Sequence, residues 1–199
     1  MTQHKDHNDD EYENLCWLDL ETTGLRPGKD AILEIGIVIT NSDIDLDVIA
    51  ELSFVVLPTK NTLHSEIDQY VIDMHKASGL WEEAVTGGDE TVHMAVACEA
   101  IVQFMAKHKA IGSPLCGSTI NFDRAFLKEQ YPELLRAFHY RNIDVWPLKN
   151  VFKTHFPSAP PFVPAKDKKH RVIADLNDTI DEYRHYIELI DGCLDYERD

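Results

Sequence analysis

The chain is poor in basic residues and has no long hydrophobic run. It has 199 residues, with 19 lysines and arginines against 35 aspartates and glutamates, and its formal net charge is −16. A protein that wraps long nucleic acid non-specifically needs a basic surface, so this balance argues against that class of binding. No apolar stretch approaches the roughly 20 residues of a membrane-spanning helix. An enzyme that handles one or two phosphates with bound metal ions stays compatible with this charge.

Cysteine is also scarce, and none of the four cysteines forms a CxxC pair: they are Cys16, Cys98, Cys116 and Cys193. We therefore expect no disulfide framework and a reducing, cytoplasmic compartment. The first 13 residues have neither the apolar core of a secretory signal nor the arginines of a transit peptide. We expect a disordered acidic tail over 1–13, a single domain over 14–192 and a C-terminal tail over 193–199.

Apolar runs typical of strands are interleaved with helical patterns. Strands are predicted around 15–22, 31–41, 48–57, 114–118 and 141–145. Helices are predicted over 63–84 with a break near 78–79, and over 91–108, 121–131, 132–138, from Pro147 onward, and 170–190. Three strands joined by short turns predict an antiparallel meander. The whole pattern predicts an α/β fold with a mixed five-stranded central sheet flanked by helices.

Two carboxylates, Asp19 and Glu21, end the first apolar run, N-L-C-W-L-D-L-E-T-T-G. Side chains alternate along a strand, so both are expected to point to one face. Neighbouring carboxylates at the end of a buried strand repel each other unless a cation lies between them, and a divalent ion with oxygen ligands is the simplest candidate. A solvated acidic pair at a strand edge is the ordinary alternative.

Three more residues of suitable chemistry occur downstream. Asp123 lies near a predicted helix start, and Asp175 lies in the last predicted helix, five residues after His170. Four carboxylates fit a site for two divalent ions about 3.5–4 Å apart, where one ion activates a water and the other stabilises the leaving oxygen at phosphorus. Asp19 is the candidate to bridge the ions. His170 could accept the proton of the attacking water, because imidazole titrates near neutral pH.

These residues resemble the motifs of the DEDD superfamily of 3′–5′ exonucleases. D-L-E-T-T-G resembles its first motif, N-F-D-R-A-F its second and H-R-V-I-A-D its third, with the histidine of the DEDDh subtype. M-H-K-A-S-G-L at 74–80 and F-H-Y-R-N-I-D-V at 138–145 further resemble the oligoribonuclease family. The resemblance implies an RNase H-like fold, two Mg²⁺ or Mn²⁺ ions held by the four carboxylates, and His170 as the general base. It also implies that very short RNA is degraded to nucleoside 5′-monophosphates.

Contacts to the substrate bases are implied by the same resemblance. Leu25 matches a leucine that wedges between two bases. Tyr70 stands where the family has a stacking tryptophan. His75 matches a histidine near the phosphate end of the substrate. Without the resemblance, Tyr70 and His75 would be read as ordinary core and surface residues.

Contacts to the 5′ phosphate are implied at the other end of the pocket. Thr119 stands where the family has a serine that caps this phosphate together with an arginine, matched by Arg141, whose planar fork suits phosphate. Tyr140 matches a tyrosine that reaches the site from a partner subunit, which implies a homodimer. Trp146 and Pro147 replace a Ser-Thr pair near the cap, so the preference for substrate length, sugar and 5′ phosphate stays open.

Two other functions remain open at this point. One is a broader DEDDh exonuclease acting on single-stranded DNA or RNA ends, or on another small phosphodiester. The other is a non-catalytic nucleotide-binding module on the same fold. Among further charged residues, we interpret Asp178, Asp181 and Glu182 as the solvated face of the last helix and Lys166, Lys168 and Lys169 as a solvated loop.

Overall fold

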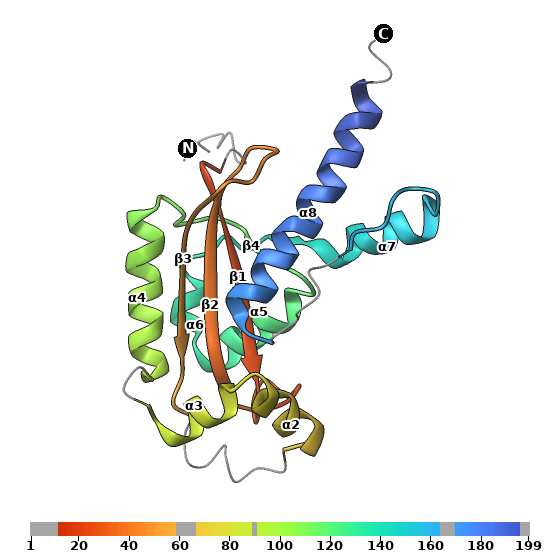
Figure 1. Ribbon diagram of the computed structural model, residues 1–199. Coiled ribbons are helices and arrows are strands. Elements are labelled where there is room, and N and C mark those ends of the chain that lie inside the picture. Colours follow the sequence, from red (N-terminus) through yellow and green to blue (C-terminus); the bar gives the residue numbers. More distant parts are fainter. Residues whose placement is uncertain (1–11, 59–66, 89–90, 164–169, 196–199) are drawn as a thin grey trace, which may run out of the picture.

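A five-stranded mixed sheet forms the centre of the computed structural model, which describes residues 12–58, 67–88, 91–163 and 170–195 (Figure 1). The strands are β1 (Asn14–Thr22), β2 (Ile32–Asn41), β3 (Val48–Val55), β4 (Leu115–Gly117) and β5 (Asn142–Asp144). The first three form an antiparallel meander, and β4 and β5 extend the sheet from β1 in parallel, giving the order β3-β2-β1-β4-β5. The predicted fold class and the predicted meander are both confirmed.

The helices lie close to their predicted places, with differences at the ends. They are α2 (Gln69–Ala77), α3 (Leu80–Thr86), α4 (Met94–Lys107), α5 (Asn121–Gln130), α6 (Pro132–Leu135), α7 (Val145–His155) and α8 (Val172–Asp195). The predicted break near 78–79 is real, because Gly79 adopts the left-handed conformation between α2 and α3. The helix predicted over 132–138 is only one turn long. The last helix continues to Asp195, beyond its predicted end at 190 and into the segment expected as a tail.

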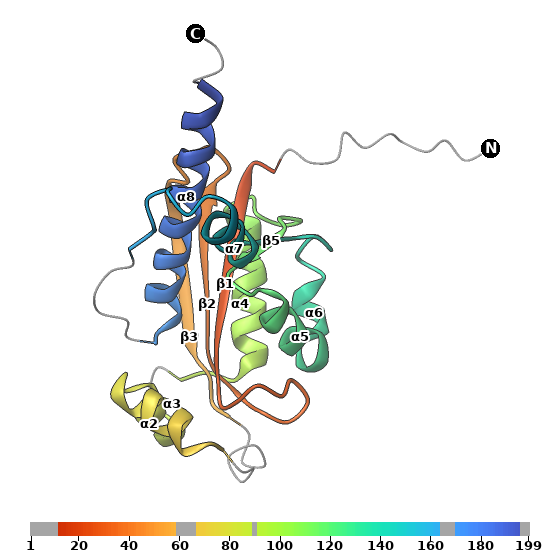
Figure 2. The same ribbon diagram turned by 90° about the vertical axis from the view of Figure 1, so that its right-hand side faces the viewer.

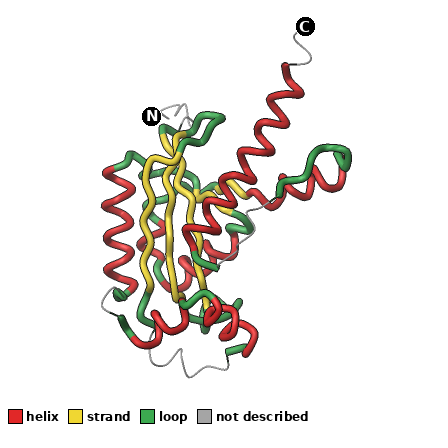
Figure 3. Tube along the Cα trace, in the orientation of Figure 1, coloured by secondary structure: helices red, strands yellow, loops and turns green. Residues whose placement is uncertain are grey.

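The alternation of β1 assigns its two faces to different helices. Its even-numbered residues Cys16, Leu18 and Leu20 pack in one buried cluster with residues of α4, α5 and α6. Its odd-numbered residues Leu15 and Trp17 pack in a second cluster with residues of α8. Figures 2 and 3 show the sheet between α4 on one side and α8 on the other. Because Asp19 and Glu21 continue the odd-numbered series, they lie on the face that α8 covers.

The first turn of α8 contacts β2 at a glycine. Gly36 lies directly across from Asp19 in the antiparallel pair. A Cβ atom added to Gly36 would lie 2.4 Å from Cγ2 of Val172, closer than packed carbon atoms approach. The absence of a side chain at this position therefore allows α8 to approach the two carboxylates of β1.

We expect Gly36→Ala to destabilise the fold by about 1–3 kcal/mol, because an added methyl group must displace Val172 from a filled core. Urea denaturation measures this loss. Gly192→Ala is the matched control, since nothing lies within 4 Å of the added Cβ on α8 and alanine favours a helix. Equal stability changes for the two variants would contradict the close contact at Gly36.

Candidate active site

Three elements that are distant in the sequence bring the predicted catalytic residues together. Asp19 and Glu21 lie near the carboxyl end of β1 on the face covered by α8. Asp175 lies in the first turn of α8, and His170 lies two residues before this helix. The ligand atoms of Glu21, His170 and Asp175 all lie within 4.8 Å of one another. The alternation of β1 and the docking of α8 therefore form the centre of the site.

Asp123 enters the site from the parallel side of the sheet. Since β4 pairs with β1 in parallel register, α5 begins beside β1 and carries Asp123 in its first turn. This carboxylate is buried, and its Oδ1 accepts a hydrogen bond from the backbone N–H of Leu20, at 3.1 Å. A carboxylate in the first turn of a helix is also favoured by the helix dipole. Asp123 is thus held at the residue that separates Asp19 from Glu21.

The crowded carboxylates hold their protons more strongly than isolated acids. Burial, with the charge of Asp175 as the next cause, raises the pKa of Asp19 to about 7. Burial and the charge of Asp19 raise the pKa of Glu21 to about 8. The pKa of Asp123 is raised by the same two causes. Such a cluster is costly in its ionised form unless a cation binds to it.

The donor set fits a hard divalent cation. Carboxylate oxygens are the ligands that Mg²⁺ and Mn²⁺ prefer, and an imidazole nitrogen is compatible with Mn²⁺. The raised pKa values of Asp19 and Glu21 are a second indication, because a bound cation would offset both the burial and the mutual repulsion that raise them. Asp19, Glu21, Asp123 and Asp175 are the residues that could hold such ions.

An open cleft of about 520 Å³ contains these groups, and its lining includes all five predicted catalytic residues together with Leu25 and Thr119. Leu25 is largely exposed at the mouth of the cleft. Thr119 has a positive φ of 59°, and its N–H donates to Oδ1 of Asp144, the N-cap of α7, at 2.9 Å. The cleft therefore extends from the carboxylates to the start of α7.

His75 lies beneath the cleft rather than in it. Its ring is fully buried, and Nε2 donates to the carbonyl oxygen of Thr22 at 2.9 Å. Its Nδ1 has no hydrogen-bond partner among the described residues and lies 3.9 Å from Oε2 of Glu21. Burial is the main cause that lowers the pKa of His75, which favours the neutral ring. His75 is therefore a buried residue beside Glu21, and its role as a substrate contact stays a prediction.

The remaining predicted contacts do not line this cleft in the single chain. Tyr70, on α2, is 73% exposed, and Tyr140, before β5, is 74% exposed. Arg141 lies over the ring of Tyr140, with its guanidinium carbon 5.4 Å from the ring centre. These three residues stay predictions as substrate contacts, because no substrate or second subunit is present to test them.

One interpretation of a charged residue was wrong, namely that Glu182 belongs to the solvated face of the last helix. Glu182 is buried, accepts a hydrogen bond from Tyr186 at 3.0 Å and forms an ion pair with Lys149 at 2.9 Å. Asp178 is partly exposed, and it lines the cleft together with Glu182. Their spacing of three and seven residues from Asp175 was the signal available in the sequence, because such residues share one face of a helix. Lys166, Lys168 and Lys169 lie outside the described residues.

Lys149 and two aromatic residues in the cleft were also missed. Lys149 is the one lysine or arginine among the described residues that line it, and Phe122 and Phe162 add apolar surface. Aromatic rings of this kind provide faces on which nucleic-acid bases stack. Phe122 belongs to the motif N-F-D-R-A-F but was not singled out, and no motif marked Lys149 or Phe162, because their positions in the cleft depend on how α7 and the segment before α8 pack.

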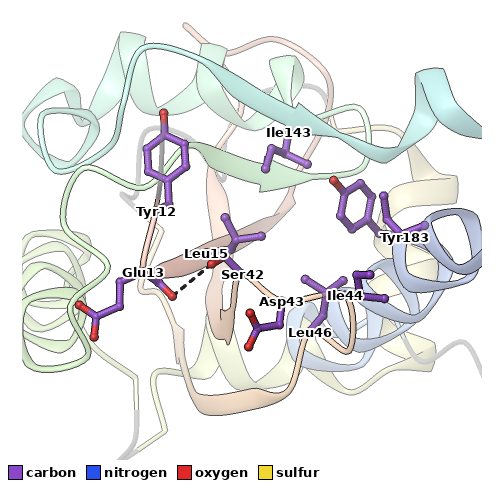
Figure 4. Close-up of a pocket in the computed structure, with 10 residues that line it drawn as sticks. Tyr12, Glu13, Leu15, Ser42, Asp43, Ile44, Leu46, Ile143 and Tyr183 are labelled. Atoms are coloured by element: carbon purple, nitrogen blue, oxygen red, sulfur yellow. Dashed lines mark hydrogen bonds between the residues drawn. The ribbon is translucent and has the colours of Figure 1, made fainter. Parts of the chain in front are cut away.

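A second cavity, of about 650 Å³, lies near the start of β1 (Figure 4). It is lined mainly by apolar and tyrosine side chains, including Tyr12, Ile143 and Tyr183, with Glu13 and Asp43 as its carboxylates. Neither histidine nor cysteine is present among the described residues that line it. The chemistry therefore points to the carboxylate cleft as the candidate active site.

Comparison with known proteins agrees with this geometry. The family model described as Exonuclease matches residues 16–183. The chain belongs to this exonuclease family. Its relatives include proteins named oligoribonuclease: the one from Bordetella pertussis is 39% identical over 177 residues, covering 87% of this chain and 93% of the relative. The one from Chromobacterium violaceum is 37% identical over 176 residues, covering 88% and 94%.

Solved structures support the same RNase H-like exonuclease fold. The zinc-bound Escherichia coli exonuclease I complex with single-stranded DNA has a TM-score of 0.67 and 14% identity, covering 94% of this chain and 43% of that one. Exonuclease I from Methylocaldum szegediense has a TM-score of 0.61 and 14% identity, covering 88% and 40%. The chain thus spans about two fifths of these structures, and the likeness is one of fold. Among the described residues, no helix is both long and apolar enough to cross a membrane.

Proposed function

We propose that this protein is a metal-dependent 3′–5′ exoribonuclease that degrades very short RNA to nucleoside 5′-monophosphates. The observation that carries the proposal is the complete set of four carboxylates and one histidine in a single cleft. The relatives named oligoribonuclease, similar over most of both chains, support the substrate class. A non-catalytic module would have no need for this costly cluster of buried acids.

In the proposed reaction Asp19, Glu21, Asp123 and Asp175 would hold two Mg²⁺ or Mn²⁺ ions. The ions, when bound, supply Lewis acidity for an in-line attack of water at phosphorus and stabilise charge on the leaving oxygen. His170 accepts the proton of the attacking water. Its position within 4.8 Å of the ligand atoms of Glu21 and Asp175 supports this role.

The substrate is expected to be short because the cleft offers little positive charge beyond the ions. A volume of about 520 Å³ is within the range of small-ligand sites. Leu25 and Thr119 are the rim residues proposed to contact a base and the 5′ phosphate. Tyr70, Tyr140 and Arg141 are proposed to complete the pocket, with Tyr140 coming from the partner of a homodimer. The net charge of −16 disfavours long, non-specific contacts to RNA or DNA.

The deciding experiment compares hydrolysis of a 5′-phosphorylated diribonucleotide, a seven-residue RNA and a single-stranded DNA, each with and without Mn²⁺. We expect metal-dependent release of nucleoside 5′-monophosphates, with the highest kcat/KM for the diribonucleotide. Equal or faster cleavage of the longer RNA or of DNA would favour a broader DEDDh exonuclease. This alternative is kept because Trp146 and Pro147 replace a Ser-Thr pair of the family near the predicted phosphate cap. Absence of hydrolysis in all three cases would contradict the proposal.

A further inference from the structure

A fifth carboxylate, Glu34, adjoins the cluster from β2 and is buried. Glu34 is only 2% exposed and lies directly across from Glu21 in the antiparallel pair. Like charges at directly opposite positions of a sheet destabilise it. The charge of Glu34 also contributes to the raised pKa values of Asp19 and Glu21. Something must therefore neutralise Glu34 if the site is to stay ordered.

The guanidinium of Arg171 performs this neutralisation. Its Nε donates to both carboxylate oxygens of Glu34 at 3.0 Å, and its Nη2 donates to Oε1 at 3.0 Å. The backbone N–H of Val172, the first residue of α8, donates to Oε2 of Glu34 at 3.2 Å. Glu83 on α3 accepts a further bond from Nη1 of Arg171 at 3.2 Å. One buried carboxylate thus binds both the arginine and the amino end of α8.

This interaction lies at the backbone that carries the proposed base. His170 immediately precedes Arg171 and adopts a left-handed conformation with φ of 45°, which a non-glycine residue adopts only when its surroundings impose it. Asp175 follows within one turn, and its N–H donates to the carbonyl oxygen of Arg171 at 3.1 Å. Any displacement of Arg171 would therefore move His170 and Asp175 together.

We propose that Arg171 is a positioning residue that, through its fork-like contact with Glu34, fixes His170 and the first turn of α8 against Glu21. The proposal rests on the proposed function, in which His170 is the general base. A planar guanidinium suits this task because it binds both oxygens of one carboxylate in a fixed geometry. While Glu34 is bound in this way, its carboxylate is also kept from competing with Glu21 for a cation.

The test compares Arg171→Met with Arg184→Met as a matched control. Arg184 lies on α8, which Arg171 immediately precedes. It is 28% exposed against 29% for Arg171, and it binds the same helix to the carbonyl oxygens of Asp45 and Leu46. It does not line the cleft. We expect Arg171→Met to lower kcat for a diribonucleotide about 10- to 100-fold, with KM changed less than about threefold. We expect Arg184→Met to leave kcat within twofold when both are assayed well below their Tm values.

The double variant Arg171→Met/Glu34→Gln separates positioning from simple charge neutralisation. It leaves no unpaired buried carboxylate, so its Tm is expected to recover relative to Arg171→Met. Its kcat is expected to stay low, because the contact that fixes His170 is still absent. Arg171→Lys, which keeps the charge without the fork, is expected to recover only part of the kcat. Recovery of full kcat in the double variant, or a kcat for Arg171→Met equal to that of Arg184→Met, would overturn the proposal.

A readout independent of turnover is Mn²⁺ binding by the metal-free protein, measured by calorimetry. In Arg171→Met, Asp175 in the first turn of α8 is expected to be displaced, and Mn²⁺ binding is expected to weaken about tenfold. In Arg184→Met, Mn²⁺ binding is expected to stay unchanged. Unchanged Mn²⁺ affinity in Arg171→Met would count against positioning even if RNA were not the substrate. Failure of the wild-type protein to hydrolyse a diribonucleotide, with this difference in Mn²⁺ affinity preserved, would instead contradict the proposed function alone.

Discussion

Replacing Asp19 with asparagine is expected to lower kcat for metal-dependent hydrolysis of a diribonucleotide by at least about 10³-fold, while the protein stays folded. The physical reason is the position of Asp19. It lines the cleft beside Glu21, Asp123 and Asp175, whose charges act on it, and a neutral amide there could not supply the charge that two cations would need. Single-turnover hydrolysis at saturating Mn²⁺, with calorimetric Mn²⁺ binding in parallel, measures the effect.

Asp181→Asn is the matched control for this substitution. Asp181 is also an aspartate near the site in sequence, but it is exposed on α8, pairs with Arg184 and does not line the cleft. We expect its kcat to remain within twofold of the wild type, because surface pairs contribute little. Retention of more than a tenth of the wild-type kcat by Asp19→Asn would exclude Asp19 as a bridging ligand.

The parts of the site that the sequence predicted are those set by local periodicity. The period of two in β1 places Asp19 and Glu21 on one face. The spacing of His170 and Asp175 brackets the first turn of α8. Spacings of this kind within one strand or one helix turn do not depend on how the rest of the chain packs. The strands of the central sheet were predicted from the same local patterns. The convergence of β1, α5 and α8 was supplied by the resemblance to the DEDDh exonucleases, because no local pattern specifies it.

The features that were missed or misinterpreted depend on packing between distant elements. Glu182 looked like a surface acid, yet Lys149 of α7 and Tyr186 enclose it in the cleft. The burial of the His75 ring beside Thr22 depends on how α2 packs against β1, and its predicted place near the phosphate end of the substrate stays untested. The ion pair between Glu34 and Arg171 joins residues 137 positions apart, which no spacing rule connects. Tyr140 and Arg141 remain untested because their predicted roles require a second subunit or a bound substrate.

The stability of the metal-free protein is expected to fall as the pH rises from about 5.5 to about 8. Unfolded chains ionise Asp and Glu near pH 4, whereas in the folded chain the pKa is raised to about 7 at Asp19 and to about 8 at Glu21. Within this window the folded state binds more protons than the unfolded state, so the free energy of unfolding decreases with increasing pH. We expect the Tm in EDTA to drop by on the order of 10 °C, measured by calorimetric scans.

Two comparisons assign this loss to the carboxylate cluster rather than to the general acidity of the chain. Asp19→Asn carries a permanently neutral group within the cluster, so its Tm in EDTA should exceed that of the wild type at about pH 8, with a smaller excess near pH 5.5. Added Mn²⁺ should raise the wild-type Tm at about pH 8, because a ligand that binds only the folded state stabilises it, and should raise that of Asp19→Asn much less. Asp181→Asn should follow the wild type in both series.

Parallel pH profiles for the wild type and Asp19→Asn would show that the cluster does not cause the instability. The expected divergence would mean that the same crowding of acids which destabilises the empty site is what makes it bind cations.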